Sequence, residues 1–190
     1  SQLKGSISLP GFDFQTTLDV LPDPSYSSVS YPFLQNNTQT PAPGREAVAD
    51  CSLTLDTPGE RFELGNDISE TGEVVCIEIT ADDVVFDGNN RTIASDTASS
   101  EPPETVGIRV TGQNVTVRNV TVSGWRTGIE VLADDATVED ATATGNIYTG
   151  IAVVSATNAS LRGVEARNSS TDDFVFSTGI TLRDVTDSTV

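Results

Sequence analysis

Apolar and polar residues alternate along most of the chain after residue 50, in short runs separated by polar turns. An apolar residue at every second position is typical of a half-buried β-strand, and no run is long enough for an amphipathic helix. One four-residue opening recurs along the chain, and its aligned copies are Cys76–Ile79, Gly107–Val110, Gly128–Val131 and Gly150–Val153, of which the last three begin 21 and 22 residues apart. This period predicts an all-β solenoid, in which stacked modules cover each other's apolar side.

The same alignment predicts which side chains point into the core. We expect three inward columns, and two outward columns in which acidic and basic residues alternate between modules. Alternating charges favour this register by about 0.2–1 kcal/mol per exposed pair, although chance explains either outward column alone. The first inward column is Ile77, Ile108, Ile129 and Ile151, the second is Ile79, Val110, Val131 and Val153, and the third is Val117, Val138, Leu161 and Leu182. The first outward column is Glu78, Arg109 and Glu130, and the second is Arg118, Glu139, Arg162 and Arg183.

Two segments resemble the N-terminal cap and first rung of right-handed parallel β-helix proteins of the NosD-like, pectin-lyase-like group. They are residues 51–68, which begin Cys-Ser-Leu-Thr-Leu, and residues 76–93, which contain Val-Val-Phe-Asp-Gly-Asn-Asn-Arg-Thr-Ile. The resemblance implies a parallel β-helix over residues 49–190, with a cap at 49–75 and rungs of about 21–23 residues from residue 76. Archaeal surface proteins carry many such domains. The scaffold also serves lyases, glycoside hydrolases and adhesins, so the resemblance implies a fold and no single activity.

Residues 1–48 differ in composition from the rest of the chain. They contain six of the nine prolines and five aromatic residues without a repeat. Proline at this density excludes a central strand or a helix. Two interpretations remain open: a linker from an upstream domain, and an extended arm that packs on its own β-helix or on a neighbouring subunit, which we favour.

Two further segments depart from the repeat. Residues 94–105, which include Pro102 and Pro103, are expected to protrude from the first rung as a loop. Phe174 and Phe176 are expected to replace the Ile and Val of earlier rungs. The rung pattern continues to Val190, where we expect an unpaired sheet edge that more rungs or another subunit would cover.

The acidic composition points to an unusual solvent. Twenty-eight acidic residues stand against ten basic ones, the net charge is −18, and Lys4 is the single lysine. Such a surface repels itself at low ionic strength and is screened at molar salt, which predicts a halophilic archaeon or its virus as the source. A hydrophobic content of 36% argues against disorder. Nucleic-acid binding would need a basic patch, which the sequence lacks, and no membrane span or signal peptide is visible.

Cysteines and glycosylation sequons together predict an extracellular location, on a cell or a virion. Cys51 and Cys76 are expected to form a disulfide that ties the cap to the first rung, with two free buried thiols as the alternative. Asn-x-Ser/Thr sequons are candidates for N-glycosylation, and which of them are used stays open. They begin at Asn36, Asn90, Asn114, Asn119, Asn158 and Asn168.

Few residues suggest catalysis or metal binding. The chain has no histidine and no methionine, so the usual base near neutral pH and the usual copper ligands are missing. Asp82–Asp83 and Asp134–Asp135 share a turn position, with Gly112–Gln113 on the rung between them. This places the pairs roughly 10 Å apart, beyond the spacing of glycosidase carboxylates. Solvated turn aspartates are the favoured interpretation, calcium binding at these turns stays open, and we assign no catalytic, cofactor or metal residue.

A last alignment concerns the aromatic corner of the rungs. Setting Gly128 on Gly150 places Trp125 over Ile147 and Arg126 over Tyr148. This favours a cation–π stack or a packed corner over a sugar-binding platform.

The favoured function is a non-enzymatic extracellular module of a halophilic archaeal surface structure, filament or viral appendage. Its arm and open C-terminal edge would mediate contacts between subunits, and its rungs would display glycans. The alternatives are a carbohydrate-active enzyme, either a polysaccharide lyase or a glycoside hydrolase, and a carbohydrate-binding β-helix.

Overall fold

A computed structural model describes residues 18–19, 33–34, 45–70, 72–96, 104–167 and 178–190. Contacts divide the chain into two units, residues 1–42 and residues 43–190. In the first unit, β1 (Leu18–Asp19) pairs antiparallel with β2 (Phe33–Leu34). The other residues of the predicted arm up to 44 lie outside the described residues.

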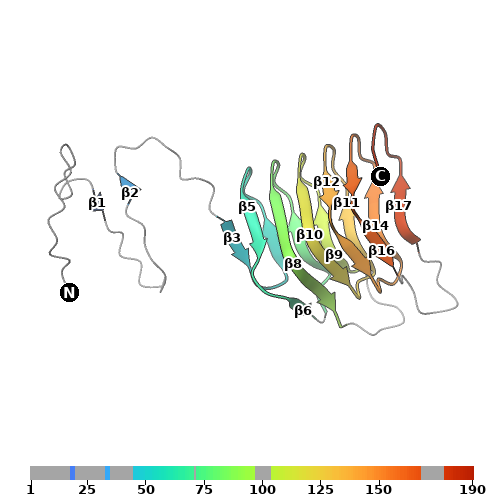
Figure 1. Ribbon diagram of the computed structural model, residues 1–190, viewed down its shortest axis with the longest axis horizontal. Helices are drawn as coiled ribbons and strands as arrows, with labels where there is room; N and C mark the ends of the chain where they lie inside the picture. Colours follow the sequence, from blue (N-terminus) through green and yellow to red (C-terminus); the bar gives the residue numbers. More distant parts are fainter. Residues whose placement is uncertain (1–17, 20–32, 35–44, 71, 97–103, 168–177) are drawn as a thin grey trace. The chain divides into compact units, whose positions relative to one another are not determined.

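The second unit consists of two parallel sheets, and the chain alternates between them (Figure 1). The six-stranded sheet contains β4 (Leu53–Leu55), β7 (Val75–Ile79), β9 (Val106–Val110), β11 (Thr127–Val131), β14 (Thr149–Val154) and β17 (Thr178–Arg183). The nine-stranded sheet contains β3 (Arg45–Val48), β5 (Arg61–Leu64), β6 (Ile68–Glu70), β8 (Val85–Ser95), β10 (Thr116–Ser123), β12 (Thr137–Glu139), β13 (Thr142–Thr144), β15 (Ser160–Arg162) and β16 (Glu165–Arg167). Every described regular element is a strand, as predicted.

The predicted cap is itself a rung of these sheets. Its strands β4, β5 and β6 pair in parallel with β7 and β8. One more strand precedes it, because β3 pairs with β5 although residues 45–48 were assigned to the arm. Of the predicted loop at 94–105, Ala94 and Ser95 end β8, residues 97–103 lie outside the described residues, and Val106 begins β9.

The predicted inward columns form the core between the sheets. Ile77, Ile108, Ile129 and Ile151 are direct neighbours on successive strands of the six-stranded sheet, and each side chain is completely buried. Val117 pairs with Val138, and Val138 with Leu161, in the nine-stranded sheet. Burial of each large aliphatic side chain contributes about 1.5–3 kcal/mol. The register of the central rungs is therefore confirmed.

The last rung of the prediction is wrong in register. Leu182 pairs with Val153 in the six-stranded sheet, and Arg183 pairs with Val154, so neither continues the columns of Leu161 and Arg162. Ile180 extends the isoleucine column instead, because it pairs with Ile151. The fifth rung therefore opens at Gly179, and Phe174 and Phe176, which were expected in this place, lie outside the described residues.

Candidate functional site

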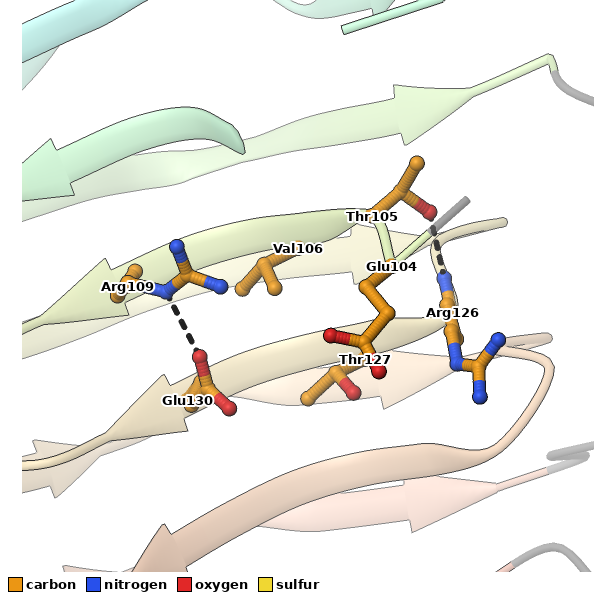
Figure 2. Close-up of a pocket in the computed structure, with 7 residues that line it drawn as sticks. All are labelled: Glu104, Thr105, Val106, Arg109, Arg126, Thr127 and Glu130. Carbon is orange, nitrogen blue, oxygen red and sulfur yellow. Dashed lines mark hydrogen bonds and ion pairs between the residues drawn. The ribbon is translucent and has the colours of Figure 1, made fainter. Parts of the chain in front are cut away.

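A shallow hollow lies on the outer face of the six-stranded sheet, near the start of β9 and β11. Its volume is about 110 Å³, and it is lined by Glu104, Thr105, Val106, Arg109, Arg126, Thr127 and Glu130. Figure 2 shows the Arg109 and Glu130 side chains facing each other, with the Glu104 carboxylate between this pair and Arg126. The hollow is thus bordered by two guanidinium groups and two carboxylates.

One of the predicted outward columns forms an ion pair here. Arg109 Nε donates to Glu130 Oε2 at 2.7 Å, and these side chains are 27% and 23% exposed. The two residues are direct neighbours on β9 and β11, as Glu78 and Arg109 are on β7 and β9. An exposed pair of this kind contributes about 0.2–1 kcal/mol, so its effect is mainly to hold the Arg109 side chain in place.

The aromatic corner matches its prediction. The Arg126 guanidinium lies over the Tyr148 ring at 4.0 Å from the ring centroid, and the Tyr148 N–H donates to the Arg126 carbonyl at 2.9 Å. Trp125 is buried, and its Nε1–H donates to the Ile93 carbonyl at 3.2 Å. The cation–π stack is confirmed, and the tryptophan is part of a packed corner because its ring faces the core.

The size of the hollow limits what it binds. Ligand pockets commonly measure about 300–1,000 Å³, so a hollow of about 110 Å³ encloses a carboxylate or a few water molecules. Arg126 would suit a carboxylate by charge, whereas Arg109 is already paired with Glu130. Chemically, the hollow fits a contact point for an acidic group rather than an enclosed active site.

The turns that connect the two sheets contain a ladder of polar residues. Gly59, Asp83, Asn114, Asp135, Asn158 and Asp187 occupy equivalent positions, and each has a positive φ between 52° and 73°. The Asn114 amide Nδ2 donates to Asp83 Oδ1 at 2.7 Å, and the Asn158 Nδ2 donates to Asp135 Oδ1 at 2.6 Å. Asparagine therefore separates the aspartates of alternate rungs. Glycine, asparagine and aspartate suit these turns because they tolerate this left-handed conformation.

The two ladder aspartates Asp83 and Asp135 are each preceded by an aspartate that binds the backbone of the next rung. Asp82 Oδ1 accepts the Gln113 N–H at 2.8 Å, and Asp134 Oδ1 accepts the Thr157 N–H at 2.6 Å. The rung between the two aspartate pairs presents Gln113 and Asn114, whereas the sequence alignment had placed Gly112 and Gln113 there. The Asp82 and Asp134 carboxylates therefore connect successive rungs, because each accepts a hydrogen bond that a backbone N–H of the next rung would otherwise make with water.

A second polar cluster lies at the corner of the nine-stranded sheet, around Asp87. Its carboxylate accepts hydrogen bonds from the Asn89 N–H at 3.0 Å and the Asn119 Nδ2 at 3.0 Å, and forms an ion pair with Arg118 at 2.8 Å. Arg118 also lies 3.8 Å from Glu139, its predicted column neighbour. Burial raises the pKa of Asp87, but hydrogen bonds from Asn119, Asn89 and Arg118 outweigh it and lower the pKa below its ordinary value.

The predicted disulfide is present, and the predicted sequons differ in their surroundings. Cys51 is bonded to the buried Cys76. Asn114 and Asn158 belong to the turn ladder, Asn119 belongs to the Asp87 cluster, and Asn90 lies in an irregular part of β8. Asn36 and Asn168 lie outside the described residues.

Sequence reasoning missed the ladder role of these asparagines. The signal was available, since Asp83, Asn114, Asp135 and Asn158 each follow the second inward column by four or five residues. Among the described residues, no group of three or more His, Cys, Asp or Glu side chains is arranged to hold a metal ion. No helix in the described part of the chain is long and apolar enough to cross a membrane.

Comparison with known protein families agrees with this architecture. The family model described as "Right handed beta helix region" matches residues 106–190. This part of the chain is a right-handed β-helix region. The β-helix region thus includes strands β9 to β17, and with them most of the hollow and of the turn ladder. No curated protein and no solved structure matches the chain. The resemblance is confirmed for the β-helix fold, and its NosD-like and haloarchaeal details stay predictions.

Proposed function

We propose that this chain is a rigid, non-enzymatic β-helix module of an extracellular surface structure in a halophilic archaeon, such as a filament, a sheath, an adhesin or a viral appendage. The observation that carries the proposal is that turn carboxylates link one rung to the next. Asp82, Asp83, Asp134 and Asp135 each accept a hydrogen bond from the following rung. These aspartates therefore stabilise the stacking of one rung on the next, which a rigid solenoid requires.

The charge of the chain supports a saline environment. A net charge of −18 on 190 residues opposes compaction in dilute buffer. At molar salt the Debye length falls to about 3 Å, so charges on neighbouring rungs at roughly 4.8 Å no longer repel strongly. The Cys51–Cys76 disulfide supports an extracellular location, because disulfides persist in oxidising compartments.

The outermost strand supports assembly through the C-terminal edge. β17 is the last strand of the six-stranded sheet, and its Leu182 is 48% exposed, whereas its partner Val153 on β14 is 1% exposed. A strand at the edge of a sheet offers unpaired backbone groups to another strand. In this proposal a second copy of the module stacks on β17, and the N-terminal arm adds contacts between neighbouring subunits.

Electron microscopy of the purified chain in molar KCl tests this assembly. We expect regular end-to-end polymers, and we expect Leu182→Glu to abolish them by placing a charge at the stacking edge. Leu132→Glu is the matched control, because Leu132 is similarly exposed, at 39%, but directly follows β11, which β14 separates from the last strand. Chains that stay monomeric in sedimentation experiments, or polymers that tolerate Leu182→Glu, would reject the proposal.

The hollow favours a second candidate function, the binding of an acidic polysaccharide as a carbohydrate-binding module or a carbohydrate-active enzyme. Arg109 and Arg126 line the hollow, and the Tyr148 ring lies beside it under Arg126. Titration calorimetry with a polyuronate, and an assay for its cleavage, test this candidate. Arg126→Ala should weaken binding at least several-fold, and equal binding by the variant would exclude this site.

A further inference from the structure

Three of the described sequon asparagines have side-chain amides that already bind a carboxylate on a neighbouring rung. The Nδ2–Oδ1 distances are 2.7 Å for Asn114 with Asp83, 3.0 Å for Asn119 with Asp87, and 2.6 Å for Asn158 with Asp135. Exposure alone does not separate the sequons, since Asn90, Asn114 and Asn158 are all exposed. The hydrogen bond made by the amide nitrogen does separate them.

Such a bond matters because N-glycosylation uses the same nitrogen. The Nδ2 atom must approach the anomeric carbon of the sugar donor, so an Nδ2 that donates to an aspartate has to leave its partner first. Hydrogen bonds to charged groups are the stronger class of hydrogen bond in proteins. Leaving would also break the hydrogen bonds by which the Asp83 and Asp135 carboxylates hold the next rung. The folded turn ladder thus withholds these nitrogens from a transferase.

Asn90 has a different environment. Asp87 pairs with Arg118 and Arg91 pairs with Val120, so residues 88–90 face the single residue Asn119 and form a bulge in β8. The Asn90 side chain is exposed and makes no hydrogen bond to other described residues.

The conformation of this bulge is fixed by its neighbours. Asn89 and Asn90 both have positive φ, and the Asn89 N–H donates to Asp87 Oδ1. At the other end, the Thr92 N–H donates to Asp67 Oδ1 at 2.8 Å. A bulge of this kind projects its extra residues from the ladder of strands. The Asn90 side chain is therefore exposed to solvent on a backbone that hydrogen bonds hold at both ends of the bulge.

We propose that Asn90 is the N-glycan acceptor of the folded chain, and that the side-chain amides of Asn114, Asn119 and Asn158 serve instead as hydrogen-bond donors to aspartates on neighbouring rungs. The donor would be a glycan attached to a lipid phosphate or pyrophosphate. Nδ2 forms a bond to the anomeric carbon, the carbon–oxygen bond to phosphate breaks with its electrons on the phosphate, and Nδ2 gives up one proton. The occurrence of this reaction in the native organism rests on the proposed extracellular location.

The placement of this glycan is compatible with stacking at β17. Asn90 belongs to β8, which is separated from the outermost strand β15 of its sheet by β10 and β12. A glycan on Asn90 therefore leaves the C-terminal edge uncovered. By contrast, a glycan on Asn158 would stand on the fourth rung, where Asn158 N–H donates to the Thr186 carbonyl of the last rung at 2.9 Å.

An in vitro transfer assay tests the proposal. The folded chain, with Asn36→Gln and Asn168→Gln to remove the two sequons outside the described residues, is incubated with an oligosaccharyltransferase and a lipid-linked oligosaccharide. Peptide mass spectrometry then gives the occupancy of each site. We expect occupancy at Asn90 to exceed that at each ladder asparagine at least tenfold, and we expect the reduced, denatured chain to lose this preference.

A pair of variants isolates the ladder bond. Asp83→Ala removes the acceptor of the Asn114 amide and should raise occupancy at Asn114 several-fold. Asp82→Ala removes the neighbouring carboxylate, which binds the Gln113 N–H and not Asn114, and should leave occupancy unchanged. Thermal melting verifies that both variants are folded. Equal occupancy of Asn114 and Asn90 in the folded chain, or transfer to Asn90 only after denaturation, would overturn the proposal. Neither outcome depends on polymer formation, so the assembly proposal is judged separately.

Discussion

The glycine that opens the third rung gives the sharpest test of the stacking geometry. A Cβ atom added to Gly128 would lie 2.5 Å from the Gly150 carbonyl oxygen and 2.7 Å from Asn146 Nδ2. Both distances are far below van der Waals contact, and the carbonyl belongs to the backbone of the next strand. Gly128→Ala therefore forces β11 and β14 apart, or displaces the buried Asn146.

The magnitude follows from what each displacement breaks. Overpacking of a rigid core costs about 1–3 kcal/mol. Asn146 is completely buried, accepts the Trp125 N–H at 3.1 Å and donates to the Val122 carbonyl at 3.1 Å. A buried group left without its partner costs about 1–3 kcal/mol more. We expect Gly128→Ala to lower the free energy of unfolding by about 2–6 kcal/mol, a large part of the 5–15 kcal/mol typical of a domain.

Gly65→Ala is the matched control. An added Cβ there would meet its nearest atom, the Val48 carbonyl oxygen, at 3.4 Å, which is ordinary contact. Because alanine also restricts the unfolded chain, this change should be neutral or stabilising by up to about 1 kcal/mol. Guanidinium chloride unfolding of both variants, followed by circular dichroism, measures the difference. If the two variants differ by less than about 0.5 kcal/mol, the close approach of successive rungs at Gly128 is refuted.

Three further predictions concern charge and covalent linkage. The melting temperature should rise when KCl increases from 0.1 M to 2 M, because the net charge of −18 is then screened. A melting temperature that stays constant or falls over this range of KCl would contradict the prediction. The folded-state pKa of Asp87 is lowered, so its carboxylate stabilises the fold above the unfolded pKa of about 4 and loses this effect as pH falls. The stability difference between the wild type and Asp87→Asn should accordingly be largest near pH 6 and shrink in unfolding curves at pH 3. Replacing both Cys51 and Cys76 by alanine should cost about 3 kcal/mol in chemical unfolding, a loss that dithiothreitol should reproduce in the wild type.

The central columns were predictable because two periods constrain the same residues. Alternation along a strand selects the inward side chains, and the repeat of 21 or 22 residues sets each of them on its neighbour. Ile108, Ile129 and Ile151 satisfy both periods, and they pair directly in the structure. A one-residue slip would have turned every isoleucine toward solvent, so burial fixes the register strongly.

Leu182 was misplaced because the spacing between rungs is not constant. Thr149 pairs with Thr178, a separation of 29 residues, whereas Arg109 and Glu130 are separated by 21. Extending the shorter period assigned Leu182 to the nine-stranded sheet. The correct signal was local, because Gly179 and Ile180 repeat the glycine–isoleucine opening of the earlier rungs. A loop of any length leaves the strand pairing after it unchanged, so the opening is a better guide than the period.

The turn ladder was harder to predict, since polar turns have no apolar periodicity of their own and align only through the inward column that precedes them. Asp83 is 31 residues from Asn114, and the alignment set this pair of turns one residue out of register. Nothing in residue type alone tells a solvated Asp83 from one that accepts an amide hydrogen. That distinction needs the distance between Asp83 and Asn114, which only the stacked structure supplies.

The ladder also explains how so acidic a chain joins its rungs. With 28 acidic and ten basic residues, most carboxylates have no cationic side chain to pair with. Ion pairs on a surface are in any case weakened by molar salt. Hydrogen bonds from amide and backbone N–H groups act at contact distance, where mobile ions do not intervene, and Asp82, Asp83, Asp134 and Asp135 all receive one. Asparagine at alternate rungs thus gives Asp83 and Asp135 a neutral neighbour and a donor, which a second aspartate in that position would not provide.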